Sequence, residues 1–133
     1  MKVIANIERE PGEKNFSCHM NIEPLKTGVL GLGSSAKAAI KDMLNGLNDA
    51  IADLKEDGQK VPELEIEYRF DVGSLFSYYD FVNIAGVARE IGLNSSVIRQ
   101  YVIGTRKPSA ERKEQIVAGF KSLADKMQHA VLS

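Results

Sequence analysis

The sequence predicts an α+β fold, in which a small antiparallel sheet packs on one helix and an all-helical segment follows. Three patterns predict it: apolar and polar residues alternate in the first half, one long stretch between these alternations repeats at helical spacing, and only short helical repeats follow Ser74. The 133 residues are 44% hydrophobic and 26% charged, which excludes collagen-like and disordered chains. We expect two small domains, residues 1–71 and 72–133.

Strands of the first domain are predicted from period-two alternation. Residues 3–8 and 16–22 alternate in this way. Glu10-Pro11-Gly12-Glu13 lies between them and is a turn signal, because Pro fixes φ and Gly accepts positive φ, so an antiparallel hairpin is expected. Residues 64–70 form the clearest alternation and have acidic residues on the polar side. A short further strand around residues 29–32 stays open as an alternative.

One long amphipathic helix is predicted between the hairpin and the last strand. Ser34 or Ser35 can cap its start, and Gly58 can end it. Its apolar residues recur at spacings of three and four and would face the sheet. They are Ala36, Ile40, Met43, Leu44, Leu47, Ile51 and Leu54.

Neither the glycines nor the histidines of the chain predict a ligand site. Gly28, Gly31 and Gly33 precede the helix, but a Walker phosphate loop needs Lys directly after the last of them, so we interpret this segment as a flexible turn. His19 and His129 have no second His or Cys at ligand spacing. We therefore expect no metal and no cofactor.

A helix, a tight turn and a second helix are predicted in the second domain. Apolar residues at helical spacing run through residues 84–91 and again through residues 97–102. Two helices that cross closely need a small residue inside the first helix and a Gly at the turn, and Ala88 and Gly92 meet both needs. A preceding short helix can be capped by Asp71 or Ser74.

The last helix is expected to close the core of this domain after a loop that holds Gly104 and Pro108. Its apolar stripe consists of Ile116, Phe120, Leu123, Ala124 and Met127.

Polar and basic residues gather on the side of the second helix that its apolar residues leave free, and in the loop after it. These residue types hydrogen-bond base edges and phosphates in a major groove. The predicted DNA-binding residues are Asn94, Ser95, Ser96, Arg99, Gln100, Thr105, Arg106 and Lys107.

Charge separates the two halves of the chain. Residues 1–71 hold nine basic and 13 acidic residues, net −4, whereas residues 72–133 hold eight and five, net +3. The basic half is the candidate for phosphate contact. The alternative for this half is a helical dimerisation module whose Lys and Arg side chains form a solvated rim.

The chain resembles two known families. Ala88, Gly92, Ile98, Tyr101 and residues 104–109 look like the helix-turn-helix of phage-repressor-like (Xre-type) regulators. Residues 21–58 and the strand that follows Pro62 resemble the sheet-and-helix domain of HicB-type antitoxins. That resemblance implies a shortened RNase H-like fold that binds and occludes a small toxin ribonuclease, HicA, while the attached domain binds double-stranded DNA and represses the operon.

The expected function is therefore that of a non-enzymatic, DNA-binding antitoxin and transcriptional autorepressor, acting as a homodimer or higher oligomer. The alternative is an orphan helix-turn-helix regulator whose first domain serves oligomerisation or ligand sensing. A hydrolytic enzyme is disfavoured because the acids of the first half, such as Glu65 and Asp49, are spread over polar faces and no pair is forced to meet.

Location follows from the apolar segments and the cysteine content. No apolar stretch approaches the roughly 20 residues that span a bilayer, so no membrane association is expected. A single Cys cannot form an internal disulfide. We expect a soluble, cytoplasmic protein.

Overall fold

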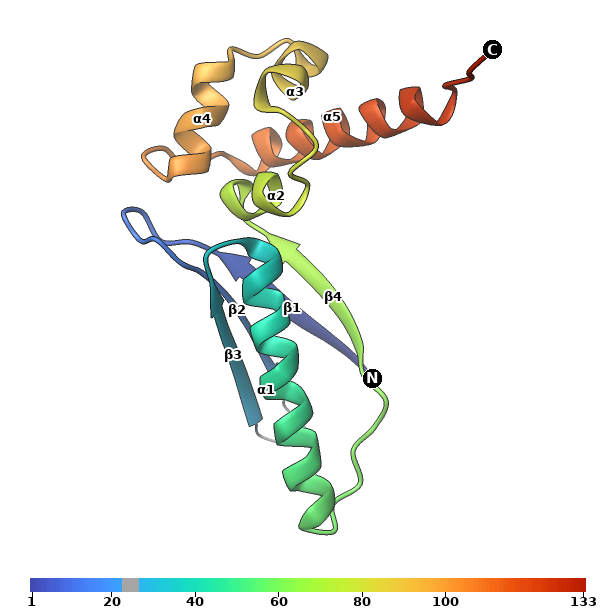
Figure 1. The fold of residues 1–133 in the computed structure, drawn as a ribbon. Helices are drawn as coiled ribbons and strands as arrows, with labels where there is room; N and C mark the ends of the chain where they lie inside the picture. Colours follow the sequence, from blue (N-terminus) through green and yellow to red (C-terminus); the bar gives the residue numbers. More distant parts are fainter. Residues whose placement is uncertain (23–26) are drawn as a thin grey trace. The chain divides into compact units, whose positions relative to one another are not determined.

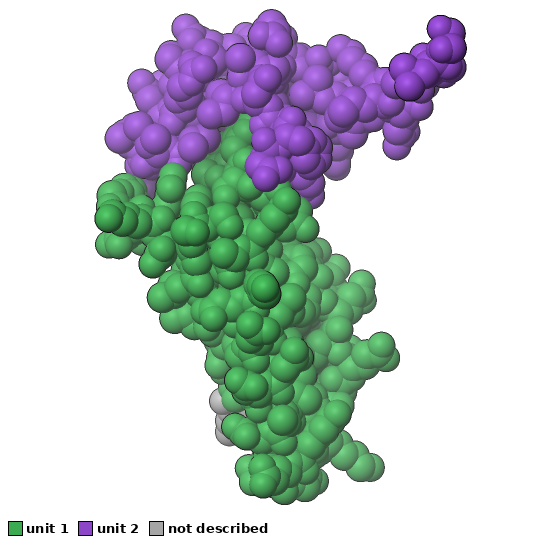
Figure 2. Space-filling model, in the orientation of Figure 1, with its two compact units in different colours: residues 1–78 green, residues 79–133 purple. Residues whose placement is uncertain are grey.

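The computed structural model describes residues 1–22 and 27–133 and divides into two compact units. Unit 1 is Met1–Tyr78 and unit 2 is Tyr79–Ser133 (Figure 2). The described part contains a four-stranded mixed sheet and five helices, so the predicted α+β class is confirmed (Figure 1).

Unit 1 is built on a sheet in the order β3-β2-β1-β4. Its strands are β1 (Lys2–Glu8), β2 (Phe16–Ile22), β3 (Thr27–Gly33) and β4 (Glu65–Phe70). β1 and β2 form the expected antiparallel hairpin, and the Glu13 amide donates to the Glu10 carbonyl at 3.1 Å in the turn between them. β2 pairs antiparallel with β3, so the alternative of a further strand is confirmed.

The prediction of a fully antiparallel sheet is wrong. β4 pairs with β1 in parallel and places Ile66 beside Val3. The physical reason is the path of the chain. Helix α1 (Ala36–Glu56) carries the chain back across one face of the sheet, so β4 enters in the same direction as β1 (Figure 1).

The glycines before α1 lie in a strand, which corrects the flexible turn expected there. Gly31 faces the helix, and a Cβ added to it would lie 2.5 Å from the Ala39 carbonyl oxygen and closer still to the Met43 amide nitrogen. A Cβ on Gly33 would lie 2.5 Å from the Ala39 nitrogen. These glycines let the backbone of α1 rest directly on β3, an approach that any side chain would block.

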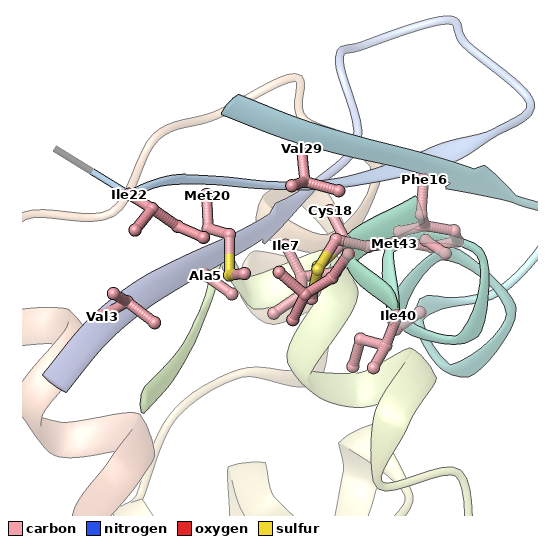
Figure 3. Close-up of a cluster of buried hydrophobic side chains, with 13 residues drawn as sticks. Val3, Ala5, Ile7, Phe16, Cys18, Met20, Ile22, Val29, Ile40 and Met43 are labelled. Carbon is pink, nitrogen blue, oxygen red and sulfur yellow. The ribbon is translucent and has the colours of Figure 1, made fainter. Parts of the chain in front are cut away.

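The core of unit 1 lies between the sheet and α1. Val3, Ala5 and Ile7 alternate inward from β1, and Met43 from α1 is completely buried among them and their neighbours (Figure 3). The Ser35 hydroxyl caps α1 by accepting from the Ala38 amide at 3.1 Å. The predicted helix start and inward face are therefore confirmed.

Helix α2 (Val72–Tyr78) belongs to unit 1. The Asp71 carboxylate caps it by accepting from the Ser74 amide at 2.8 Å. The Ser74 hydroxyl, fully buried, donates to the Ile7 carbonyl of β1 at 2.7 Å. This bond fastens α2 to the sheet, so the division between units falls after Tyr78 and not after Asp71, where the sequence placed it.

Unit 2 contains three helices, α3 (Ile84–Ile91), α4 (Ser95–Ile103) and α5 (Ala110–Gln128). Val87 of α3, Ile98 of α4 and Ile116 of α5 are buried together with Ala88 and Tyr101.

α5 crosses α3 at Gly119, where an added Cβ would lie 2.7 Å from the Ile91 side chain. Phe120 and Leu123 are half-buried, but Ala124 and Met127 are exposed, which corrects the predicted core stripe. The reason is length: α3 has eight residues and α5 has 19, so the last turns of α5 extend beyond their partner.

Candidate nucleic-acid interface

The turn between α3 and α4 depends on Gly92. Its φ is +68°, in the left-handed region that Gly adopts without strain. The chain then returns so that the Leu93 amide donates to the Ala88 carbonyl at 2.9 Å. Ala88 is 2% exposed, so a larger side chain has no space at this crossing. The two helices and the turn lie where the sequence predicts them.

Helix α4 has two different faces. Ile98 and Tyr101 are buried and hold the helix on unit 2, as their spacing predicted. Ser96, Arg99 and Gln100 are exposed on the opposite side. The backbone that carries these polar side chains is therefore fixed by the core behind it, which is the arrangement that a recognition surface requires.

Asn94 and Ser95 play a local role that the sequence interpretation did not assign to them. The Asn94 side-chain oxygen caps α4 by accepting from the amide and the hydroxyl of Ser96, both at 2.9 Å. The Ser95 hydroxyl is half-buried and accepts from Arg99 Nη1 at 2.9 Å. Two signals could have predicted these roles: an Asn at the start of a helical pattern, and a Ser four residues before an Arg.

Backbone carbonyl groups at the end of α4, chiefly that of Gln100, hold the loop that follows. Gly104 ends the helix with φ +84°, and the amides of Gly104 and Thr105 each donate to the Gln100 carbonyl oxygen at 3.1 Å. The side chains of Thr105, Arg106 and Lys107 are exposed. The loop therefore has an ordered backbone from which two cations project beside the exposed face of α4.

The electrostatic character of this surface is positive. Between residues 99 and 113 the sequence has five basic residues and one acid, Glu111. Across residues 1–22 and 27–133, no ion pair joins Arg99, Arg106 or Lys107 to a carboxylate. The three cations are therefore available to an anionic partner. The eight sequence-predicted residues, 94–96, 99, 100 and 105–107, come together as one segment: α4 with the loop that follows it.

No family model, curated protein or solved structure matches the chain.

Charged side chains also meet on the sheet of unit 1. Glu67 on β4 lies 3.2 Å from Lys2 and 2.8 Å from Arg69, and these cations lower the pKa of Glu67. His19 lies 3.5 Å from Glu8. Within the described ranges no group of three or more His, Cys, Asp or Glu residues is placed to hold a metal ion, and no helix is long and apolar enough to cross a bilayer.

Proposed function

We propose that the chain is a transcriptional regulator that binds double-stranded DNA through α4, and that it is a HicB-type antitoxin whose unit 1 captures a small HicA-like ribonuclease. One observation carries the DNA-binding part. Arg99 and Gln100 are exposed on a helix whose opposite face, at Ile98 and Tyr101, is anchored in the core. A polar helix face alone is common on protein surfaces, but here the basic loop with Arg106 and Lys107 continues the polar face of α4.

In this mechanism α4 enters the major groove and its side chains read base edges. A guanidinium such as that of Arg99 can donate two hydrogen bonds to guanine O6 and N7, and the amide of Gln100 can pair with adenine. The hydrogen bond that Arg99 donates to the Ser95 hydroxyl restrains Arg99 along the helix before DNA arrives. Less side-chain freedom is then lost on binding.

The loop supplies affinity that does not depend on sequence. Arg106 and Lys107 project from an ordered backbone and neutralise phosphates, which releases counterions from the duplex. One unit of this size contacts few bases, so operator binding uses a homodimer or higher oligomer that places two copies of α4 in successive major grooves about 34 Å apart.

Support for toxin capture is architectural. Unit 1 has a small sheet with the long helix α1 on one face, as the resemblance to HicB-type antitoxins implies, and it also contains the short α2. It precedes the proposed DNA-binding unit, in the order that the resemblance implies. If a short, basic reading frame beside this gene encodes a ribonuclease that co-purifies with the chain, the antitoxin role holds. If no such partner exists, the chain is an orphan regulator in which unit 1 serves assembly or ligand sensing.

The DNA-binding part is tested with a labelled duplex from the region upstream of the chain's own reading frame, by fluorescence anisotropy against a scrambled duplex. Arg99→Ala should weaken binding by about 1 to 3 kcal/mol and reduce the preference for the upstream sequence. Lys107→Ala should weaken binding to both duplexes equally and reduce the slope of log affinity against log salt by about 1.

Lys121→Ala is the matched control, because Lys121 is an exposed cation on α5 outside this surface. It should leave the preference for the upstream duplex unchanged. The assignment is refuted if the unaltered chain, Arg99→Ala and Lys107→Ala all bind both duplexes with the same affinity.

A further inference from the structure

One large apolar side chain lies on the exposed polar face of α4. Ile103, the last residue of the helix, is 56% exposed. It follows Arg99 by four positions and Gln100 by three, and these spacings place the three side chains on one face of a helix. Ile103 is not among the predicted DNA-binding residues, which are all polar or basic.

The other apolar residues of α4 are used by the fold of unit 2. Ile98 and Tyr101 are buried in its core, and Val97 and Val102 are half-buried at the border of that core. Ile103 is the fifth apolar residue of the helix and stays largely in water when unit 2 folds. Its apolar area therefore remains available to a partner, which gains free energy by covering it.

The surroundings of Ile103 indicate the chemistry of that partner. Arg99 and Gln100 lie before it on the helix face, and Arg106 and Lys107 project from the loop that follows. Across α4 and this loop, all of which the structure describes, Ile103 is the only large apolar residue that is exposed. The buried core of a protein interface is mostly apolar and depleted of charged residues. A single apolar side chain among cations therefore suits a nucleic acid better than a protein.

Thymine is the base whose major-groove edge matches this surface. It presents one apolar group, the 5-methyl group, beside a hydrogen-bond acceptor, and the neighbouring bases present further polar groups. We propose that Ile103 contacts the 5-methyl group of a thymine and so selects thymine at that position of the operator. The inference rests on the proposed function and adds to it a residue that recognises a base by apolar contact.

Helix geometry places this thymine relative to the base that Arg99 contacts. Ile103 lies four residues after Arg99, and four residues of an α-helix rise about 6 Å. Successive base pairs are about 3.4 Å apart along the duplex. The thymine should therefore lie about two base pairs from the base that Arg99 reads.

The test is fluorescence anisotropy of the full chain with two versions of the upstream duplex, one with thymine and one with deoxyuridine at every thymine position. Deoxyuridine lacks the 5-methyl group and keeps the hydrogen-bonding groups of thymine. The unaltered chain should bind the deoxyuridine duplex about fourfold more weakly for each methyl group that it buries. Ile103→Ala should bind the thymine duplex more weakly than the unaltered chain does, and should bind the two versions with nearly equal affinity. Replacing one thymine at a time should then locate the contact.

Two further variants make the comparison specific. Ile103→Val keeps a branched apolar side chain and should retain most of the preference for thymine. Val117→Ala shortens an apolar side chain of α5 that is 43% exposed and lies outside α4, and it should retain the full preference. Circular dichroism should show the same fold for every variant, because Ile103 and Val117 are both exposed.

Failure of this inference and failure of the proposed function give different results. If the unaltered chain prefers the upstream duplex to a scrambled one but binds its thymine and deoxyuridine versions equally, the role of Ile103 is refuted and the regulator stands. The same conclusion follows if Ile103→Ala keeps the thymine preference of the unaltered chain. It also follows if Ile103→Ala dissociates an oligomer in sedimentation equilibrium, because Ile103 then belongs to a protein contact. No preference for the upstream duplex refutes the regulator, and the role of Ile103 with it.

Discussion

Gly31 shows how a single residue sets the distance between a helix and a sheet. Its position on β3 lies directly under Ala39 and Met43 of α1. The nearest atoms belong to backbone, which cannot rotate away as a side chain can. The core of unit 1 therefore depends on the absence of a side chain here.

Gly31→Ala should lower the free energy of unfolding of unit 1 by about 1 to 3 kcal/mol, because the new methyl group overpacks the interface with α1. Urea unfolding followed by circular dichroism measures the change. Gly28→Ala in the same strand is the control, since the nearest atom to its Cβ would be the Asn21 side-chain oxygen at 3.0 Å, and the nearest backbone atom, the Met20 carbonyl oxygen, lies at 3.9 Å. It should change stability by less than about 0.5 kcal/mol. Equal losses in both variants would contradict the account of Gly31.

The sequence predicts the burial of some residues well and the long-range contacts of others poorly. Burial of Ile98 and Tyr101 follows from helical spacing, because the position of a residue on a helix face needs only local information. The roles of Gly31 and Ser74 depend on segments distant in sequence, on α1 and on β1. No local pattern contains those partners. From the sequence alone, a polar residue such as Ser74 is therefore expected to cap a helix. Its buried hydrogen bond to another element cannot be predicted.

Elements meet in this chain through specific polar ties as well as apolar contact. In unit 2 the ion pair of Glu90 with Lys126, supported by Ser122, joins α3 to the second half of α5. These donors lower the pKa of Glu90 in the folded state. A group with a depressed folded pKa stabilises the fold above its unfolded pKa, and this contribution disappears as pH falls through the folded value.

Glu90→Gln should therefore lower the urea midpoint of unit 2 at neutral pH. The difference from the unaltered chain should shrink as pH falls below the ordinary glutamate range, because the unaltered carboxyl then becomes neutral as well. Tyr79 and Phe120, whose rings lie 5.7 Å apart in unit 2, allow the unfolding of that unit to be followed through their assigned ring-proton resonances. A difference that persists or grows in acid would contradict the proposed tie.

The order and type of the elements could largely be predicted from the sequence, but their pairing could not. Alternation predicts β4 correctly because it records which face is buried. Whether β4 runs parallel or antiparallel depends on the path of the chain after α1. Likewise, the apolar stripe of α5 predicts a helix, yet burial of Met127 needs a partner longer than α3.

The whole molecule combines two units of opposite charge. No charged residue lies between Val72 and Tyr78, so the division after Tyr78 keeps the expected balance of net −4 and net +3. The acidic unit repels a nucleic-acid backbone and the basic unit attracts it. Specific binding should therefore engage unit 2 and weaken steeply with added salt.

Contact between α4 and DNA is tested most directly by a nuclear magnetic resonance titration of the full isotope-labelled chain with the upstream duplex. Amide signals of residues 94–109 should shift or broaden, while those of the sheet in unit 1 should keep their positions and broaden only uniformly, because the complex tumbles more slowly. Shifts concentrated in unit 1, or none at α4 at duplex concentrations that saturate anisotropy, would contradict it.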